Sequence, residues 1–177
     1  MILLPQTFNE NDWFVLISLL IAYAGVLRLP RLFPRTIAIL VMFFSLTLAK
    51  GADNTLGVKP LDLYDTNEIP KFDLTDMLTW AIYPAAGYLF IYLYHRLRLN
   101  GMSIAVFIVL CSLFGIAFEA VCVYFNVFHY KGWTLLYSFI TYLIVQSLTL
   151  LLFEYLQRHY KEHKKRNSKN MGWRRSG

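Results

Sequence analysis

Five long apolar runs separated by short polar stretches dominate the pattern of hydrophobic and polar positions along this chain. The runs are Trp13–Leu27, Thr36–Ala49, Met77–Tyr94, Met102–Phe125 and Trp133–Leu156. An apolar helix needs roughly 20 residues to cross the hydrocarbon core of a bilayer, with a range of about 17–25. The pattern therefore predicts an all-α, polytopic membrane helix bundle. Its five transmembrane helices are expected at about 13–29, 36–52, 77–95, 102–125 and 133–156.

The first two runs are shorter than the other three and reach spanning length only when flanking interfacial residues are counted or the bilayer thins locally. The composition supports a membrane protein, because 57% of the residues are hydrophobic against about 45–50% in a soluble domain. We expect one transmembrane domain over residues 1–157 and a basic tail over residues 158–177.

The charges between the runs alternate in sign from one loop to the next. Of the 17 Lys and Arg residues, 13 lie in the first connection, the third connection and the tail. The opposite side holds four Lys residues and eight acidic residues. Because cytoplasmic loops carry an excess of Lys and Arg, this pattern predicts an N-terminus outside the cell and a C-terminus in the cytoplasm.

The longest connection, residues 51–76, is predicted to be an acidic outer loop. Loops of this length are uncommon and often functional. Its carboxylates could bind a divalent cation, although their spacing is not that of a calcium-binding EF-hand loop, and a solvated acidic loop is the simpler interpretation. These carboxylates are Asp53, Asp62, Asp65, Glu68, Asp73 and Asp76. In the next outer connection, Tyr124, Tyr130 and Trp133 are expected to anchor the chain at the membrane interface.

Glu119 is the most informative single residue, because a carboxylate inside a membrane span is costly unless it faces the bundle or water. At helical spacing it shares one small, polar face with four other residues. These are Ser112, Gly115, Cys122 and Asn126. Small residues allow helices to approach closely, and polar residues bond across helices. Glu119 is therefore either a proton or ligand site, or a buried structural acid that is protonated or hydrogen-bonded to a Tyr or Trp.

Polar positions on two other spans could join Glu119. The fifth span carries Ser138, Tyr142, Gln146 and Thr149, and the third carries Asp76, Trp80, Tyr83, Pro84 and Gly87. They could line an outward-facing polar cavity, although hydrogen bonding between helices is the simpler explanation. His129 and Lys131 could pair with Glu119 or with a carboxylate of the acidic loop. The candidate functional cluster is Glu119, Asp53, Asp76, His129, Asn126, Tyr142 and Gln146.

The chain has no recognisable catalytic, cofactor-binding or metal-binding signature. Its four His residues lack metal-ligand spacing, and no nucleophile triad, phosphate loop or dinucleotide fingerprint is present. Cys111 and Cys122 would lie about 16 Å apart on one helix, which is too far for a disulfide. The basic tail is expected to lie along anionic lipid headgroups, and no nucleic-acid partner is expected.

Three stretches of the sequence resemble a known family. They are NDWFVLISLL at 11–20, AKGADNTLG at 49–57 with LDLYD at 61–65, and Phe118-Glu119 followed by VFHYKGW at 127–133 and Tyr137-Ser138. With them the chain resembles, over nearly its whole length, a family of small, uncharacterised multi-pass membrane proteins of spore-forming Firmicutes (bacilli and clostridia). The resemblance implies a bacterial plasma membrane and a spore-related role, and it supplies no catalytic residues. The matching positions are Asp53, Asp65, Glu119, Tyr130, Trp133 and Ser138.

Three functions stay open on the sequence. The favoured one is a non-enzymatic structural, sensing or assembly subunit of a bacterial membrane complex, working in a homo-oligomer or a hetero-oligomer. The second is a transport or channel subunit that uses Glu119 in an outward-facing cavity. The third is a membrane enzyme acting on a lipid or another apolar substrate, with Glu119, Asp53 and His129 as the acid or base.

Overall fold

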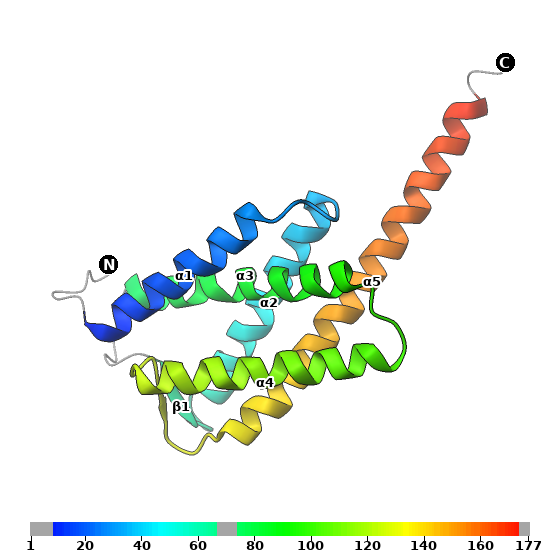
Figure 1. The fold of residues 1–177 in the computed structure, drawn as a ribbon. Coiled ribbons are helices and arrows are strands. Elements are labelled where there is room, and N and C mark those ends of the chain that lie inside the picture. Colours follow the sequence, from blue (N-terminus) through cyan, green and yellow to red (C-terminus); the bar gives the residue numbers. More distant parts are fainter. Residues whose placement is uncertain (1–8, 67–73, 174–177) are drawn as a thin grey trace.

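The chain folds into a bundle of long helices with one small pair of strands at one end (Figure 1). The computed structural model describes residues 9–66 and 74–173, without the side chains of Thr66, Leu74, Asp76 and residues 167–173. Within these residues there are five helices and two strands. They are α1 (Glu10–Arg28), α2 (Arg35–Leu56), β1 (Tyr64–Thr66), α3 (Leu74–Leu97), α4 (Met102–Tyr124), β2 (Phe128–Tyr130) and α5 (Leu135–Trp173).

The five predicted membrane helices are confirmed as helices. Each is long and apolar enough to cross a bilayer, and each contains a candidate span: Glu10–Arg28, Arg35–Leu56, Met77–Leu97, Met102–Tyr124 and Leu135–Arg166. The chain reverses direction at every connection. The N-terminus of α1, the C-termini of α2 and α4, and the N-termini of α3 and α5 therefore gather at one end of the bundle. We call this end, which carries β1 and β2, the strand end, and the opposite end the basic end.

The predicted boundary between the second helix and the acidic loop was wrong, because helix α2 covers the first residues of the region predicted as a loop. Helix α2 continues four residues past its predicted end at Ala52 and stops at Leu56. The extra turn is stabilised by a 3.0 Å ion pair between Lys50 and Asp53 and by the Thr55 hydroxyl, which donates to backbone carbonyls of the preceding turn. Farther along the same region, residues 64–66 form strand β1. Glu68 and Asp73 lie outside the described residues.

Helix α3 occupies the middle of the bundle. It packs against α1 and α2, while α4 packs mainly against α5, and α5 also contacts α2 and α3. The main core holds the fully buried Val41, Ile91 and Phe153, together with a ring cluster that includes Phe33 and Tyr88. A smaller core near the strand end joins α1 to α4, where Phe14 stacks on Phe125 at 4.7 Å between ring centroids.

The start of α1 is fixed to the start of α3 by a buried carboxylate. Asp12 accepts the backbone N–H of Asn9 at 2.9 Å and the hydroxyl of Thr75, and it is only 6% exposed. Because each of its oxygens has a donor, the cost of burying this carboxylate is offset. The ends of α1 and α3 are thereby held together at the strand end.

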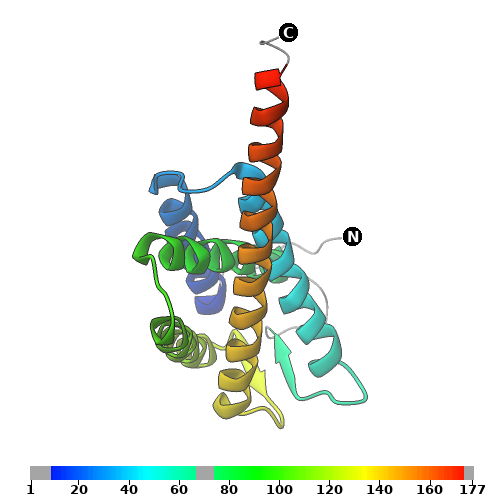
Figure 2. The same ribbon diagram turned by 90° about the vertical axis from the view of Figure 1, so that its right-hand side faces the viewer.

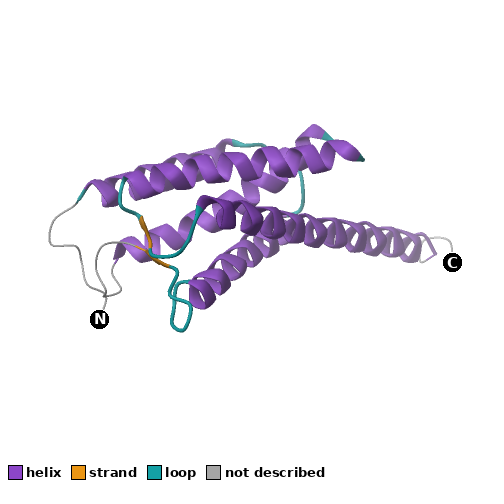
Figure 3. Ribbon diagram, turned by 90° about the horizontal axis from the view of Figure 1, so that it is seen from below, coloured by secondary structure: helices purple, strands orange, loops and turns teal. Residues whose placement is uncertain are grey.

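Strands β1 and β2 form a two-stranded antiparallel pair that joins distant parts of the sequence. Tyr64 faces Tyr130, Asp65 faces His129 and Thr66 faces Phe128. Beside the pair, the carbonyl of Leu63 accepts three backbone N–H groups, from Lys131, Gly132 and Trp133, at 2.9, 3.0 and 3.1 Å. Figure 3 shows this pair at the opposite end of the bundle from the projecting end of α5.

Helix α5 is the longest element, with 39 residues. Seen from the side in Figure 2, it runs along the whole bundle and extends well beyond the other helices at the basic end. The predicted basic tail is therefore a continuation of the fifth helix as far as Trp173.

Candidate functional site

The small, polar face predicted on α4 is confirmed as a buried face. Ser112, Glu119 and Cys122 are 0%, 7% and 5% exposed. Gly115 lies under the ring of Tyr142 on α5, because a Cβ atom built there would be 3.2 Å from that ring. Asn126 departs from the pattern: it is exposed and has a φ of 57°, which places it in the turn after α4 rather than on the buried face.

Glu119 lies at the centre of a hydrogen-bonded cluster near the strand end. Its Oε1 accepts the hydroxyls of Tyr130 and Ser138, the latter at 2.6 Å, and its Oε2 accepts the hydroxyl of Tyr142 at 2.6 Å. Ser138 in turn accepts the indole N–H of Trp133 at 2.7 Å. Hydrogen bonds to a charged acceptor are stronger than those between neutral groups, so these donors compensate the buried carboxylate.

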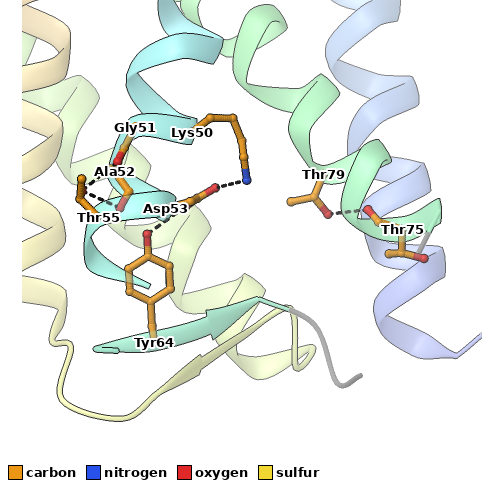
Figure 4. Close-up of polar contacts among 8 residues, drawn as sticks. All are labelled: Lys50, Gly51, Ala52, Asp53, Thr55, Tyr64, Thr75 and Thr79. Atoms are coloured by element: carbon orange, nitrogen blue, oxygen red, sulfur yellow. Dashed lines mark hydrogen bonds and ion pairs between the residues drawn. The ribbon is translucent and has the colours of Figure 1, made fainter. Parts of the chain in front are cut away.

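A second carboxylate, Asp53, lies in the same region at the end of α2 (Figure 4). Its Oδ2 accepts from Lys50 at 3.0 Å, and its Oδ1 accepts the hydroxyl of Tyr64 at 2.9 Å. The Lys50 ammonium also lies 4.1 Å from the centroid of the Trp80 ring on α3, a cation–π contact. Asp53 is therefore held between a cation and a hydroxyl.

The two carboxylates are joined by aromatic side chains. The ring of Tyr64, which binds Asp53, lies 5.5 Å from the ring of Trp133, which reaches Glu119 through Ser138. These contacts connect α2, β1, the start of α5 and α4. We call the set the strand-end cluster. Its members are Lys50, Asp53, Tyr64, Glu119, Tyr130, Trp133, Ser138 and Tyr142.

The cluster raises the pKa of two tyrosines that lie outside the candidate spans. Burial, followed by the charge of Asp53, raises the pKa of Tyr64 well above its usual value. Burial and the hydrogen bond to Glu119 do the same for Tyr130. Both hydroxyls therefore stay protonated at neutral pH and serve as donors to the carboxylates.

Lys131 pairs with the acidic segment rather than with Glu119. Its ammonium lies 2.9 Å from Asp62 and 2.9 Å from Asp65. These hydrogen bonds raise the pKa of Lys131. Because the pairs are largely exposed, they contribute little to stability, but they attach strand β1 and the loop before it to the turn after β2.

Of the seven predicted cluster residues, the structure brings together Glu119, Asp53 and Tyr142. Gln146 lies farther along α5 and accepts the Ser112 hydroxyl at 3.3 Å, a long hydrogen bond. His129 is on β2 beside Tyr130, but its buried Nδ1 has no hydrogen-bond partner among the described residues. The side chain of Asp76 lies outside the described part of the chain.

The face predicted on the third span does not point at Glu119 throughout. Trp80 faces Lys50 of α2, and Gly87 packs against Ser45 of α2. Since α3 lies between α1 and α2, part of its small and polar face serves helix packing there. Tyr130 and Trp133, expected as interface anchors, direct their polar atoms inward to the cluster, whereas Tyr124 is 80% exposed.

Lys50 and Tyr64 are the cluster members for which the sequence offered no chemical signal. Lys50 was one of the few basic residues on its side and lies within the AKGADNTLG stretch of the family resemblance, and Tyr64 lies within the LDLYD stretch. Their roles depend on Asp53, which lies in the four-residue extension of α2, and on the β1–β2 pairing. Neither the extension nor the pairing can be predicted from the spacing of apolar and polar residues along the chain.

The described residues contain no group of three or more His, Cys, Asp or Glu side chains that could hold a metal ion. Cys111 and Cys122 are both free thiols, as their spacing on one helix predicted. An open cleft of about 250 Å³ lies at the basic end, away from the cluster.

Comparison with known protein families, curated proteins and solved structures finds no match to this chain. The structure itself shows a bundle of five candidate membrane helices with a polar cluster at its strand end.

Proposed function

We propose that this chain is a non-enzymatic subunit of a bacterial membrane complex. In this proposal the strand-end cluster has a structural role and holds the helices of the chain together. The observation that carries the proposal is that both oxygens of Glu119 accept hydrogen bonds, from three hydroxyls in total. The donors come from β2 and from two successive turns of α5. The carboxylate therefore fastens the turn 125–134 and the start of α5 to α4.

A structural role agrees with the chemistry of these partners. A group that binds and releases a substrate or an ion needs an open coordination position, whereas buried polar groups with a structural role have their partners built in. Glu119 is 7% exposed and already surrounded by donors. Asp53 is likewise held by Lys50 and Tyr64.

The subunit role can be tested with the full chain purified in mild detergent. We expect a discrete assembly larger than a monomer, seen by light scattering and by cross-linking in native membranes. Glu119→Gln should preserve this assembly but lower its unfolding temperature, because the amide supplies one acceptor oxygen where the carboxylate supplies two. A strictly monomeric protein without any cross-linked neighbour would contradict the assembly role.

The second candidate is a transport or channel subunit, favoured by one observation. Glu119 and Asp53 lie at the same end of the bundle and are connected through Tyr64, Trp133 and Ser138. In liposomes, Glu119→Gln should then abolish ion or proton flux while the protein stays folded. Flux that is unchanged by this substitution would exclude the transport role and leave the structural one.

We also propose that the strand end faces the outside of a bacterial plasma membrane and the basic end the cytoplasm. The support is the concentration of 13 of the 17 Lys and Arg residues in the connections and tail of the basic end. The bacterial membrane and a spore-related role rest on the family resemblance. Expression confined to sporulating cells would support that role, and equal expression in growing cells would count against it.

A further inference from the structure

A cleft at the basic end has a chemical character different from that of the strand-end cluster. It is open, has a volume of about 250 Å³, and is lined by Tyr94, His95, Arg98, Leu99 and Glu154. The lining comes from the last turn of α3, the connection to α4, and α5. This volume is that of about eight water molecules, at roughly 30 Å³ each in the liquid. It can therefore hold a small polar group.

The cleft lies at the level where membrane spans end. The candidate span of α3 stops at Leu97, and that of α4 starts at Met102. Both of these side chains are largely exposed, at 52% and 79%. Exposed apolar side chains thus stand at both ends of the connection that supplies Arg98 and Leu99 to the cleft. This arrangement suits a ligand that has both a polar head and an apolar tail.

Opposite charges face the cleft without neutralising each other. Glu154 accepts the hydroxyl of Tyr94 at 3.0 Å, which fixes the position of its carboxylate on α5. Arg98 is exposed just after the end of α3, with a φ of 51°. Among the described residues, Arg98 and Glu154 form no ion pair with each other. The cleft therefore offers a cation and an anion separated by an open space.

One lining residue of the cleft, His95, packs against aromatic residues of the core. The ring of His95 meets Phe33 and Phe153 edge-on, at 6.0 and 5.7 Å between ring centroids. Phe153 is completely buried and is the residue next to Glu154 on α5. This aromatic packing fixes α3 against α5, so the geometry of the cleft is built into the core of the bundle.

We propose that this cleft binds the phosphoethanolamine headgroup of a membrane lipid. The guanidinium of Arg98 suits the phosphate, because it can donate two parallel hydrogen bonds to it. The carboxylate of Glu154 suits the primary ammonium, which has N–H groups to donate. A choline headgroup has no N–H donors, and a glycerol headgroup has no positive charge. The site should therefore distinguish phosphatidylethanolamine from both.

The test uses the full chain purified in detergent, with lipids of identical acyl chains. Native mass spectrometry should show phosphatidylethanolamine binding roughly tenfold tighter than phosphatidylcholine or phosphatidylglycerol, as expected for one charge-assisted contact. Arg98→Gln and Glu154→Gln should each remove this preference. The matched controls are Arg96→Gln and Glu162→Gln, which change exposed residues that do not line the cleft, and these should keep it.

Equal binding of the three lipids, or an unchanged preference in Arg98→Gln, would overturn the proposal. Because Arg98 is exposed, that variant is expected to fold even where Glu154→Gln does not. Binding of soluble phosphoethanolamine, measured in the same way, distinguishes a lipid ligand from a free headgroup. Weaker binding than that of the lipid supports the lipid, and binding as tight as that of the lipid would overturn its assignment as the ligand.

Discussion

Gly87 of α3 lies against Ser45 of α2 so closely that the two helices meet at this point with almost no side chain between them. A Cβ atom built on Gly87 would overlap the Ser45 hydroxyl and lie 2.6 Å from Ser45 Cβ. Ser45 itself is 7% exposed, and its hydroxyl donates back to the Val41 carbonyl at 2.9 Å. Close approach at small residues is a common way for membrane helices to associate.

Gly87→Ala should therefore destabilise the bundle, because α2 and α3 must separate to admit the methyl group. Overpacking of this kind costs about 1–3 kcal/mol, measurable as a lower unfolding temperature in detergent. Gly51→Ala is the control: a Cβ atom there meets nothing within 4 Å, and replacing a helical glycine should raise stability by about 0.5–1 kcal/mol. Adding Ser45→Gly to Gly87→Ala should restore part of the loss. If Gly87→Ala unfolds like the wild type, the close contact is not required.

Ser138→Ala should loosen the strand-end cluster, because it removes both the acceptor of the Trp133 indole and one donor to Glu119. Leaving such a buried group without its partner costs about 1–3 kcal/mol. The change is measurable by chemical unfolding, and the tryptophan fluorescence should shift toward that of a more polar environment. Ser147→Ala is the matched control, since within the described part of the chain the Ser147 hydroxyl bonds to the Leu143 carbonyl of its own helix. Equal effects of the two substitutions would contradict a special role for Ser138.

Stability should fall in alkaline solution. The pKa values of Tyr64 and Tyr130 are raised in the folded protein, so above a pH of about 10 the unfolded chain loses these protons while the folded chain keeps them. Their contribution is fully present below that pH and is lost as the pH rises through the raised values. Unfolding followed from pH 8 to 12 should show this loss, and Tyr64→Phe should reduce its slope. An unchanged slope in that variant would show that Tyr64 ionises normally.

Reagents outside the cell should reach the strand end of the bundle but not the basic end. Asn54 is exposed at the strand end and Asn100 at the basic end. A membrane-impermeant thiol reagent should label Asn54→Cys in intact cells, and Asn100→Cys only after permeabilisation. The wild-type protein, with its free Cys111 and Cys122, gives the background. Labelling with the reverse pattern would invert the proposed orientation.

The sequence predicted the helices well because each one carries its own evidence. A long apolar run, ended by Pro30 and Pro34 or by Asn100-Gly101, is enough to locate a membrane helix. The buried face of α4 could also be predicted, since Ser112, Glu119 and Cys122 follow the period of a helix. These local patterns were enough to predict the fold class and to identify Glu119, the central residue of the candidate site.

The partners of Glu119 could be predicted only in part. Tyr142 and Ser138 share a helix face and were expected near it, whereas the neighbourhood of Asp53 depends on contacts between residues far apart in sequence. The β1–β2 pairing is made by two strands of three residues each. Strands this short do not show a recognisable alternation of apolar and polar residues. The charge of Lys131 predicted an acidic partner, but only the folded chain identifies Asp62 and Asp65.

The unbroken course of α5 has a mechanical consequence. At about 1.5 Å per residue its 39 residues form a rod of roughly 58 Å, about twice the thickness of the hydrocarbon core. The same rod holds Ser138 and Tyr142 at one end and, among the described side chains, the basic residues between Arg158 and Arg166 at the other. Without a hinge between them, any rotation or sliding of α5 that follows a change at Glu119 moves the charged end by the same angle or distance.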